Sequence, residues 1–170
     1  METAQKSEAM EAWFLGEFEY TLDAQRRLAI PSQWRRGQDQ GARFFLLPGR
    51  ERSVQVIPGP AFNELLTRLR RVSFADAQAS VALATIGSMA TECGCDGQGR
   101  ISLSPQLMEH AGLASRGPVL LLGAVTTIQI WAPSVWRSRR LDRDVCLDVI
   151  QAIQERPQEL TEILRRRSSS

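Results

Sequence analysis

Two segments of the chain share an arrangement of residues that could bind phosphate. Residues 23–27 read Asp-Ala-Gln-Arg-Arg, and residues 96–100 read Asp-Gly-Gln-Gly-Arg. In each, an aspartate precedes an arginine by four positions, and apolar-polar alternation then leads to a proline. An arginine guanidinium binds a phosphate or a guanine edge through two parallel N–H groups. A turn between two strands would hold such a group on a rigid base, so the pattern predicts a nucleic-acid contact.

The aspartates and glycines of these turns favour a structural interpretation. Asp23 and Asp96 can accept backbone N–H groups and pair with the arginine four residues on, and Gly97 and Gly99 suit a tight turn. An exposed pair of this kind stabilises a protein by roughly 0–1 kcal/mol. The first turn is the more cationic, because further arginines follow it. The predicted DNA-binding residues are therefore Gln25, Arg26, Arg27 and Arg35, together with Arg100 on the second turn.

The two turns belong to a longer internal repeat. Three segments recur in the same order: residues 23–31 at 96–105, residues 44–47 at 119–122, and residues 54–58 at 128–133. Two halves of roughly 70 residues would each bury little surface, so we expect them to share one core. The alternating strands and intervening helices predict a mainly β fold with flanking helices, in the α+β class.

The expected elements follow from apolar spacing and from turn residues. Strands are predicted at 17–22, 28–30, 43–48, 53–58, 89–95, 101–103, 118–123 and 126–131. Helices are predicted at 32–36, from Pro60 to Val72, from Ala75 to Ile86 with Gly87 as its end, at 106–111 after a Ser104 cap, and from Pro133. We divide the chain into an extension (1–12), a first repeat (13–87), a second repeat (88–140) and a helical extension with a basic tail (141–170).

Composition excludes several functional classes. The 170 residues are 43% hydrophobic and 24% charged, without an apolar run near the roughly 20 residues that span a bilayer. The polar beginning resembles no signal peptide, so a cytoplasmic location is expected. Twenty of the 21 basic residues are arginine, which either nucleic-acid binding or a GC-rich genome would produce.

No catalytic or metal-binding pattern stands out. Cys93 and Cys95 are separated by one residue, which is poor spacing for structural zinc, and His110 is the single histidine. Phosphate loops, nucleophile elbows and paired-histidine motifs are absent from the sequence. We therefore expect neither enzymatic activity nor a cofactor, a metal or a small-molecule substrate.

The chain resembles the MraZ family over about residues 14–136. The resemblance rests on both Asp-x-x-x-Arg segments with their flanks, on residues 14–16, on Glu92-Cys93, on residues 110–113 and on Ile130-Trp131. It implies a pseudo-dimeric, swapped-hairpin barrel of the SpoVT/AbrB type and a ring-shaped homo-oligomer such as an octamer. It also implies nucleoid-associated binding to short promoter repeats upstream of the division and cell-wall gene cluster, through Asp23 to Arg27.

The sequence leaves two points open. The family usually carries Lys-Gly before the loop arginine, where this chain has Gln25-Arg26. Glycine adopts a positive φ at little cost and arginine does not, so the sequence leaves open whether both turns have one shape. A second function also remains: AbrB-type folds serve as antitoxins, and the amphipathic stretch from Leu141 to Leu164 suits a protein partner.

Overall fold

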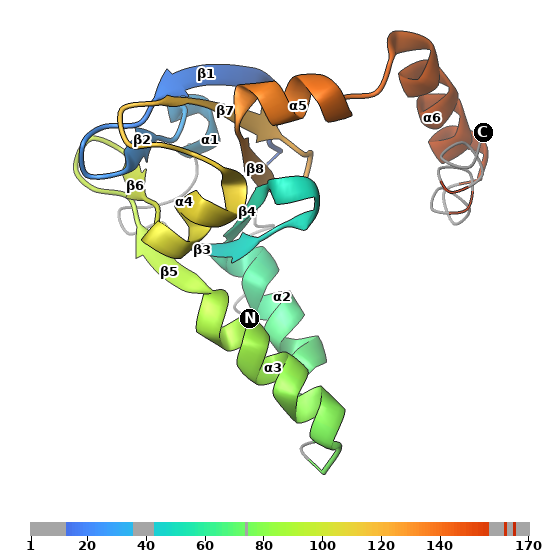
Figure 1. Ribbon diagram of the computed structural model, residues 1–170. Helices are drawn as coiled ribbons and strands as arrows, with labels where there is room; N and C mark the ends of the chain where they lie inside the picture. Colours follow the sequence, from blue (N-terminus) through green and yellow to red (C-terminus); the bar gives the residue numbers. More distant parts are fainter. Residues whose placement is uncertain (1–12, 36–42, 74, 157–161, 163–164, 166–170) are drawn as a thin grey trace, which may run out of the picture. The chain divides into compact units, whose positions relative to one another are not determined.

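The computed structural model describes residues 13–35, 43–73, 75–156, 162 and 165 (Figure 1). It divides into two compact units, residues 1–135 and 136–170. The first unit holds all the described strands and both Asp-x-x-x-Arg segments. The mixed α+β composition agrees with the expectation from the sequence. Residues 166–170 of the basic tail, together with Leu160, Ile163 and Leu164, lie outside the described residues.

A six-stranded antiparallel sheet organises the first unit, in the order β1-β7-β8-β4-β3-β5. Its strands are β1 (Glu17–Thr21), β3 (Arg43–Pro48), β4 (Val54–Pro58), β5 (Thr91–Gly94), β7 (Pro118–Gly123) and β8 (Ile128–Trp131). The repeat matches β1 with β5, β3 with β7 and β4 with β8, so exchanging the two halves reproduces the order in reverse. Strand β1 pairs with β7 of the second half, and β5 pairs with β3 of the first. Each half therefore completes the sheet of the other.

The described strands form no closed barrel, because β1 and β5 remain the edges of the sheet. A separate two-stranded ribbon pairs β2 (Arg27–Ala29) with β6 (Arg100–Ser102). The central pair of this ribbon, Leu28 and Ile101, is almost fully buried. These two side chains join the single core cluster that also contains Phe14, Phe44 and Leu121. The ribbon is thus fixed to the sheet by its apolar face, and its other face is turned outward.

Short helices follow both ribbon strands. Helix α1 (Ser32–Arg35) is held by Trp34, whose indole packs edge-on against Phe14 and Phe18 at ring-centroid distances of 5.9 and 5.0 Å. The Trp34 indole N–H also donates to the Leu15 carbonyl at 3.2 Å. Helix α4 (Pro105–Ala111) has the predicted ends: Ser104 Oγ accepts the Leu107 N–H, and Gly112 follows the last turn at φ +65°. Burial of Trp34 fixes the position of Arg35, the next residue.

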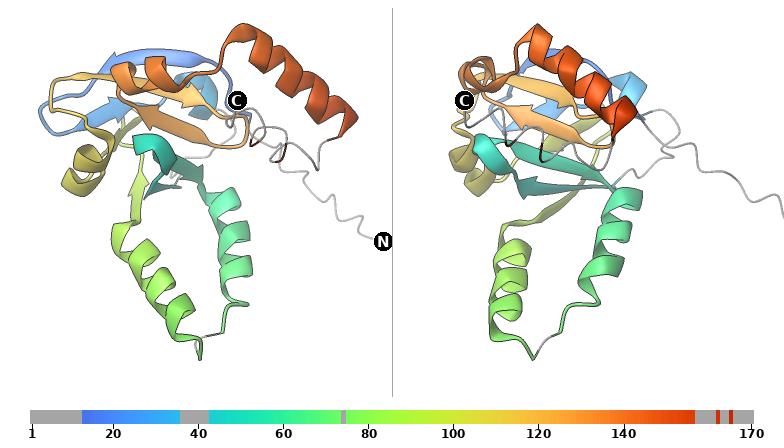
Figure 2. Two further views of the ribbon diagram at one scale, coloured as in Figure 1. Left: turned by 45° about the vertical axis from the view of Figure 1, so that its right-hand side comes forward. Right: turned by 90° about the vertical axis from the view of Figure 1, so that its right-hand side faces the viewer.

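A pair of helices is inserted between the halves. Helix α2 (Gly59–Leu69) is fixed to the sheet by Phe62, whose ring stacks on Phe45 at 3.7 Å. Helix α3 (Ala77–Met89) begins at Asp76, whose carboxylate caps the Ala79 N–H. In both views of Figure 2 the two helices extend away from the sheet on the same side. We call α2 and α3 together the helical arm.

The predicted end of α3 is wrong. The helix continues through Gly87 to Met89, and the Ala90 N–H donates to the Ile86 carbonyl. A glycine inside a helix costs about 1 kcal/mol relative to alanine. One such residue among the thirteen of α3 is not enough to end the helix. A glycine ends a helix where the backbone turns left-handed, and Gly87 keeps helical geometry.

The second unit is helical. Helix α5 (Pro133–Arg139) begins at Pro133, as predicted, and crosses the division between the units; α6 (Arg143–Glu155) follows it. Helix α6 exposes Leu147, Ile150 and Ile153. Within the described part of the chain, no helix combines the length and the apolar character that a membrane span needs.

Candidate nucleic-acid interface

The ribbon brings the two Asp-x-x-x-Arg segments together. We call residues 23–27 the first loop and residues 96–100 the second loop. Each loop leads into one strand of the ribbon, and the ladder pairs Arg27 with Ser102 and Ala29 with Arg100. Arg27 and Arg100 are therefore diagonal neighbours on the outward face of the ribbon, opposite the buried Leu28–Ile101 pair. Because each strand has three residues, its ends are only about 7 Å apart.

The two loops have the same hydrogen bonds. In the first, Asp23 Oδ1 accepts the N–H groups of Gln25 and Arg27 at 2.9 and 2.8 Å, and Arg27 Nε donates to Asp23 Oδ2 at 2.7 Å. In the second, Asp96 makes the equivalent bonds with Gln98 and Arg100 at 2.8 to 3.0 Å. The structural interpretation of both aspartates is consistent with this geometry, since each orders its own loop.

The aspartates also connect the loops to each other. Arg27 Nη1 lies 3.9 Å from Asp96 Oδ2, and Arg100 Nη1 lies 3.8 Å from Asp23 Oδ2. Each guanidinium thus lies between the carboxylate of its own loop and that of the other repeat. We call these four residues the clasp. Their side chains are about one third exposed, so the ion pairs remain in contact with solvent.

The pKa values of both clasp carboxyl groups are lowered. Burial by itself raises the pKa of Asp23, but the hydrogen bonds from Arg27 and its positive charge outweigh this effect and lower the pKa. For Asp96 the backbone N–H of Arg100 is the largest cause, and its guanidinium adds to it, so this pKa is also lowered despite partial burial. Both groups are therefore ionised at neutral pH.

Arg26 and Arg35 fill matching places at the two ends of the ribbon. Arg26 has a φ of +60° and Gly99, at the same loop position, a φ of +73°, so both turns have one shape. Arg26 Nε donates to the Leu103 carbonyl at 3.1 Å, and Arg35 Nε donates to the Ile30 carbonyl at 3.0 Å. Leu103 and Ile30 are themselves matched by the repeat.

This near-symmetry explains the missing glycine of the first loop. A Cβ on Gly99 would lie 2.6 Å from Nε and Nη1 of Arg35, so a larger residue there would have to displace the Arg35 side chain. The residue matched with Arg35 in the second half is Met108, which is buried. In the second half the Arg26 side chain therefore binds the Leu103 carbonyl, as Arg35 binds the Ile30 carbonyl in the first half. The sequence places Arg26 in the first loop and Arg35 shortly after it. The contact of Arg35 with Gly99 is evident only from the tertiary structure.

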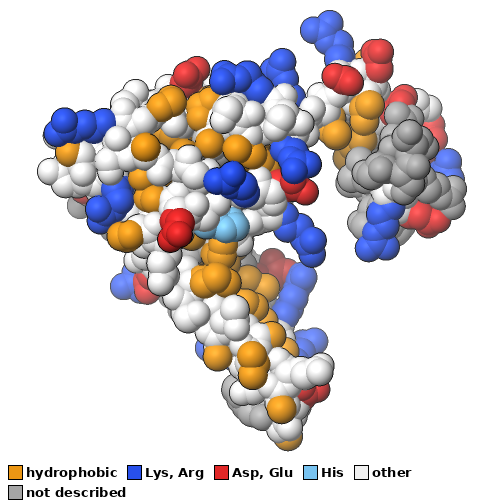
Figure 3. Space-filling model, in the orientation of Figure 1, with side chains coloured by type: hydrophobic (Ala, Val, Ile, Leu, Met, Phe, Trp, Pro, Cys, Tyr) orange, Lys and Arg blue, Asp and Glu red, His pale blue; other side chains and the backbone are white. Residues whose placement is uncertain are grey.

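The site is cationic. Arg26, Arg27, Arg35 and Arg100 gather around two carboxylates, and the exposed Gln25 accepts a bond from Arg27 Nη2 at 3.2 Å. The space-filling view in Figure 3 shows basic side chains at the end of the molecule where Figure 1 places these loops. Such a surface suits a phosphate backbone, with side chains on a rigid ribbon for base contacts. The structure brings all nine predicted site residues together.

The remaining candidates for chemistry have structural surroundings. Burial raises the pKa of Cys93 to about 12, and burial likewise raises the pKa of Cys95, which disfavours the thiolate that binds metals. His110 Nε2 lies 2.9 Å from the Gly49 carbonyl oxygen. Among the described residues, no group of three or more His, Cys, Asp or Glu side chains is placed to hold a metal ion.

The chain is similar in sequence to known proteins. Residues 87–140 match the family model for MraZ, described as "MraZ protein, putative antitoxin-like". The transcriptional regulator MraZ of Moorella thermoacetica is 35% identical over 123 residues, covering 72% of this chain and 83% of the relative. The chain belongs to the MraZ family. The MraZ regulators of Symbiobacterium thermophilum and Alkaliphilus metalliredigens are 34% and 31% identical, over 72% and 81% of this chain and 86% and 93% of the relatives.

The clasp predicts how stability depends on pH. Because both folded-state pKa values are lowered, its contribution is complete above the unfolded carboxyl pKa of about 3.9 and is lost as the pH falls through the folded values. We expect Asp23→Asn/Asp96→Asn to lower the melting temperature at pH 6 and to flatten its fall between pH 5 and pH 2.5. Thermal unfolding followed by circular dichroism measures both effects.

The control for this experiment is Asp144→Asn on α6, which removes a carboxylate outside the loops. It should keep the pH dependence of the wild type. An equally steep fall in the double variant would show that other carboxylates control acid stability.

The packing of Arg35 on Gly99 gives a second prediction. Gly99→Ala places a Cβ against the guanidinium and imposes a positive φ on alanine, which costs roughly 1–3 kcal/mol. Gly97→Ala is the matched control, because nothing lies within 4 Å of its Cβ position. Chemical denaturation should separate the two variants by that amount, and equal stabilities would contradict the described contact.

A double exchange tests the same contact further. Gly99→Arg/Arg35→Met gives the second loop the residues of the first arrangement, Arg26 with Met108. We expect it to be more stable than Gly99→Arg alone. Additive losses would show that the two positions do not interact.

Proposed function

We propose that this chain is a transcriptional regulator that binds double-stranded DNA through its first loop. The observation that carries the proposal is the clasp, which fixes two arginine-bearing loops side by side on one outward face. The curated MraZ relatives are transcriptional regulators by name. The chain is a binding protein and not an enzyme, and it acts in the cytoplasm on the nucleoid.

The two loops differ in the groups that they can present to DNA. The first carries Gln25, Arg26 and Arg27, and the second carries Gln98 between two glycines, followed by Arg100. Arg27 and Arg100 make equivalent ion pairs, so their difference in DNA binding comes from what surrounds them. Gln25 is exposed and can pair with the edge of adenine. We assign base contacts to Gln25 and Arg27, and phosphate contacts to Arg26 and Arg35.

A ring of copies supplies the affinity that one loop lacks. Several identical loops on spaced DNA repeats bind more tightly through effective concentration, without new contacts. The exchange of β1 and β5 between the halves is compatible with the swapped-hairpin arrangement of the SpoVT/AbrB type. We therefore propose a ring such as an octamer on short promoter repeats upstream of the division and cell-wall gene cluster.

Fluorescence anisotropy with labelled DNA from upstream of the chain's own gene tests this function. We expect Arg27→Ala to weaken binding by roughly 10- to 100-fold, since a specific arginine contact is worth about 1–3 kcal/mol. Affinity should also fall steeply with salt, because bound phosphates release counterions. Arg100→Ala is the matched control, since it removes the same ion pairs from the other loop and should weaken binding much less.

The possible outcomes separate the roles of the loops. Equal losses in both variants would mean that the clasp, rather than contact with DNA, accounts for the effect. Arg50→Ala, which removes one positive charge from the turn between β3 and β4, should stay within about twofold of the wild type. If Arg27→Ala binds as the wild type does, the first loop does not contact DNA.

One observation favours a second candidate, a module that binds a protein partner. Helix α6 exposes Leu147, Ile150 and Ile153, and the matched family model is described as antitoxin-like. A toxin or another partner that captures the chain through α6, with no binding to promoter DNA, would favour this candidate.

A further inference from the structure

The helical arm exposes an apolar surface unusual for a helix in water. Helix α3 has no charged residue over its thirteen positions, and all but two of them are exposed. Val81, Ile86 and Met89 are 66%, 41% and 37% exposed. The space-filling view shows hydrophobic side chains along this part of the molecule (Figure 3). A surface of this kind marks an interaction site.

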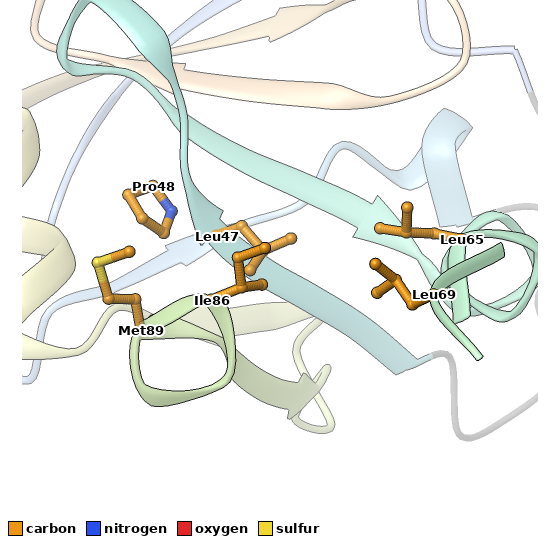
Figure 4. A pocket seen from close by; sticks show the side chains of 6 residues that line it. All are labelled: Leu47, Pro48, Leu65, Leu69, Ile86 and Met89. Atoms are coloured by element: carbon orange, nitrogen blue, oxygen red, sulfur yellow. The ribbon is translucent and has the colours of Figure 1, made fainter. Parts of the chain in front are cut away.

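An open groove lies at the base of the arm. Figure 4 shows its lining: Leu65 and Leu69 from α2, Ile86 and Met89 from α3, and Leu47 and Pro48 from β3. Its volume is about 210 Å³, enough for a large side chain. Arg68, Arg70 and Arg71 are exposed at the end of α2, adjacent in sequence to Leu69 of the groove lining, and Arg68 pairs with Glu64 at 2.7 Å.

A complementary surface lies at the edge of the sheet, within the same unit. Trp13 and Leu15 are 58% and 60% exposed, although Phe14 between them is fully buried. They continue into Glu17 and Glu19, which are exposed on the edge strand β1. We call residues 13–19 the edge row. It offers two large apolar side chains followed by carboxylates, where the groove offers an apolar hollow followed by guanidinium groups.

We propose that the edge row of one copy binds the helical arm of the next copy, with Trp13 in the groove. Trp13 then serves as the buried anchor, a role in which tryptophan is strongly enriched. Glu19 pairs with the arginines at the end of α2. The proposal rests on the proposed ring and identifies the surfaces that build it.

The two surfaces are different, which determines the symmetry of the assembly. A contact between unlike patches is heterologous, and it closes into a ring when the rotation between neighbours allows. A contact between two helical arms would instead be two-fold and would stop at a dimer. Charge complementarity favours the unlike pair, because two arms would bring the arginines of both copies into one interface.

Two full-length variants test the proposal by light scattering after size-exclusion chromatography. Trp13→Ala removes the anchor and Ile86→Arg fills the groove. We expect the wild type to form a ring at 20 μM and each variant to be monomeric. An equimolar mixture should form a 1:1 heterodimer, because Ile86→Arg keeps its edge row and Trp13→Ala keeps its groove. Ser88→Arg, two positions from Ile86 and so about 200° around the same helix, is the matched control and should assemble.

The outcomes distinguish this contact from the proposed ring. A monomeric wild type would overturn the ring and the contact together. A ring in the wild type and in both variants would overturn only the contact. Monomeric variants whose mixture stays monomeric would overturn the pairing of unlike surfaces. Circular dichroism verifies that each variant is folded, as expected for changes at exposed positions.

Discussion

The structure depends on an electrostatic constraint across the internal repeat. Each aspartate orders its own loop, and the clasp joins the Asp-x-x-x-Arg loop of one half to that of the other. A ribbon of two three-residue strands makes few backbone bonds and does not by itself fix the loops at its ends. The four charged side chains hold the ends of the ribbon, while Leu28 and Ile101 hold its middle to the core. The four residues of the clasp therefore both position the two loops and contribute to their charge.

The two halves are related by a close but incomplete two-fold symmetry. The differences between them lie in and beside the loops that we propose bind DNA. Both loops share their hydrogen bonds and their positive φ at the fourth position. They differ in whether that position is Arg26 or Gly99, and in whether Arg35 or Met108 follows the ribbon. Each arrangement satisfies the same carbonyl in its half. A duplicated fold can thus keep one loop as scaffold while the other acquires contacts.

The sequence predicts the local features of this structure better than the long-range ones. Turn residues and period-two alternation locate the strands, and Ser104 with Gly112 marks α4, because these signals act within a few residues. The pairing of β1 with β7 is not predictable in this way, since alternation indicates a buried face and not a partner. The fit of Arg35 on Gly99 likewise depends on tertiary approach. The apparent end of α3 at Gly87 shows how weak a single glycine is as a signal.

We propose that the clasped loops form the surface that contacts DNA. The most direct measurement is photo-crosslinking to promoter DNA, with a photoreactive side chain placed in turn at Gln25, at Gln98 and at the exposed Asn63 of α2. We expect strong crosslinks from Gln25, weaker ones from Gln98 and background from Asn63. Crosslinks from Asn63 with none from Gln25 would contradict it and would place the DNA on the helical arm.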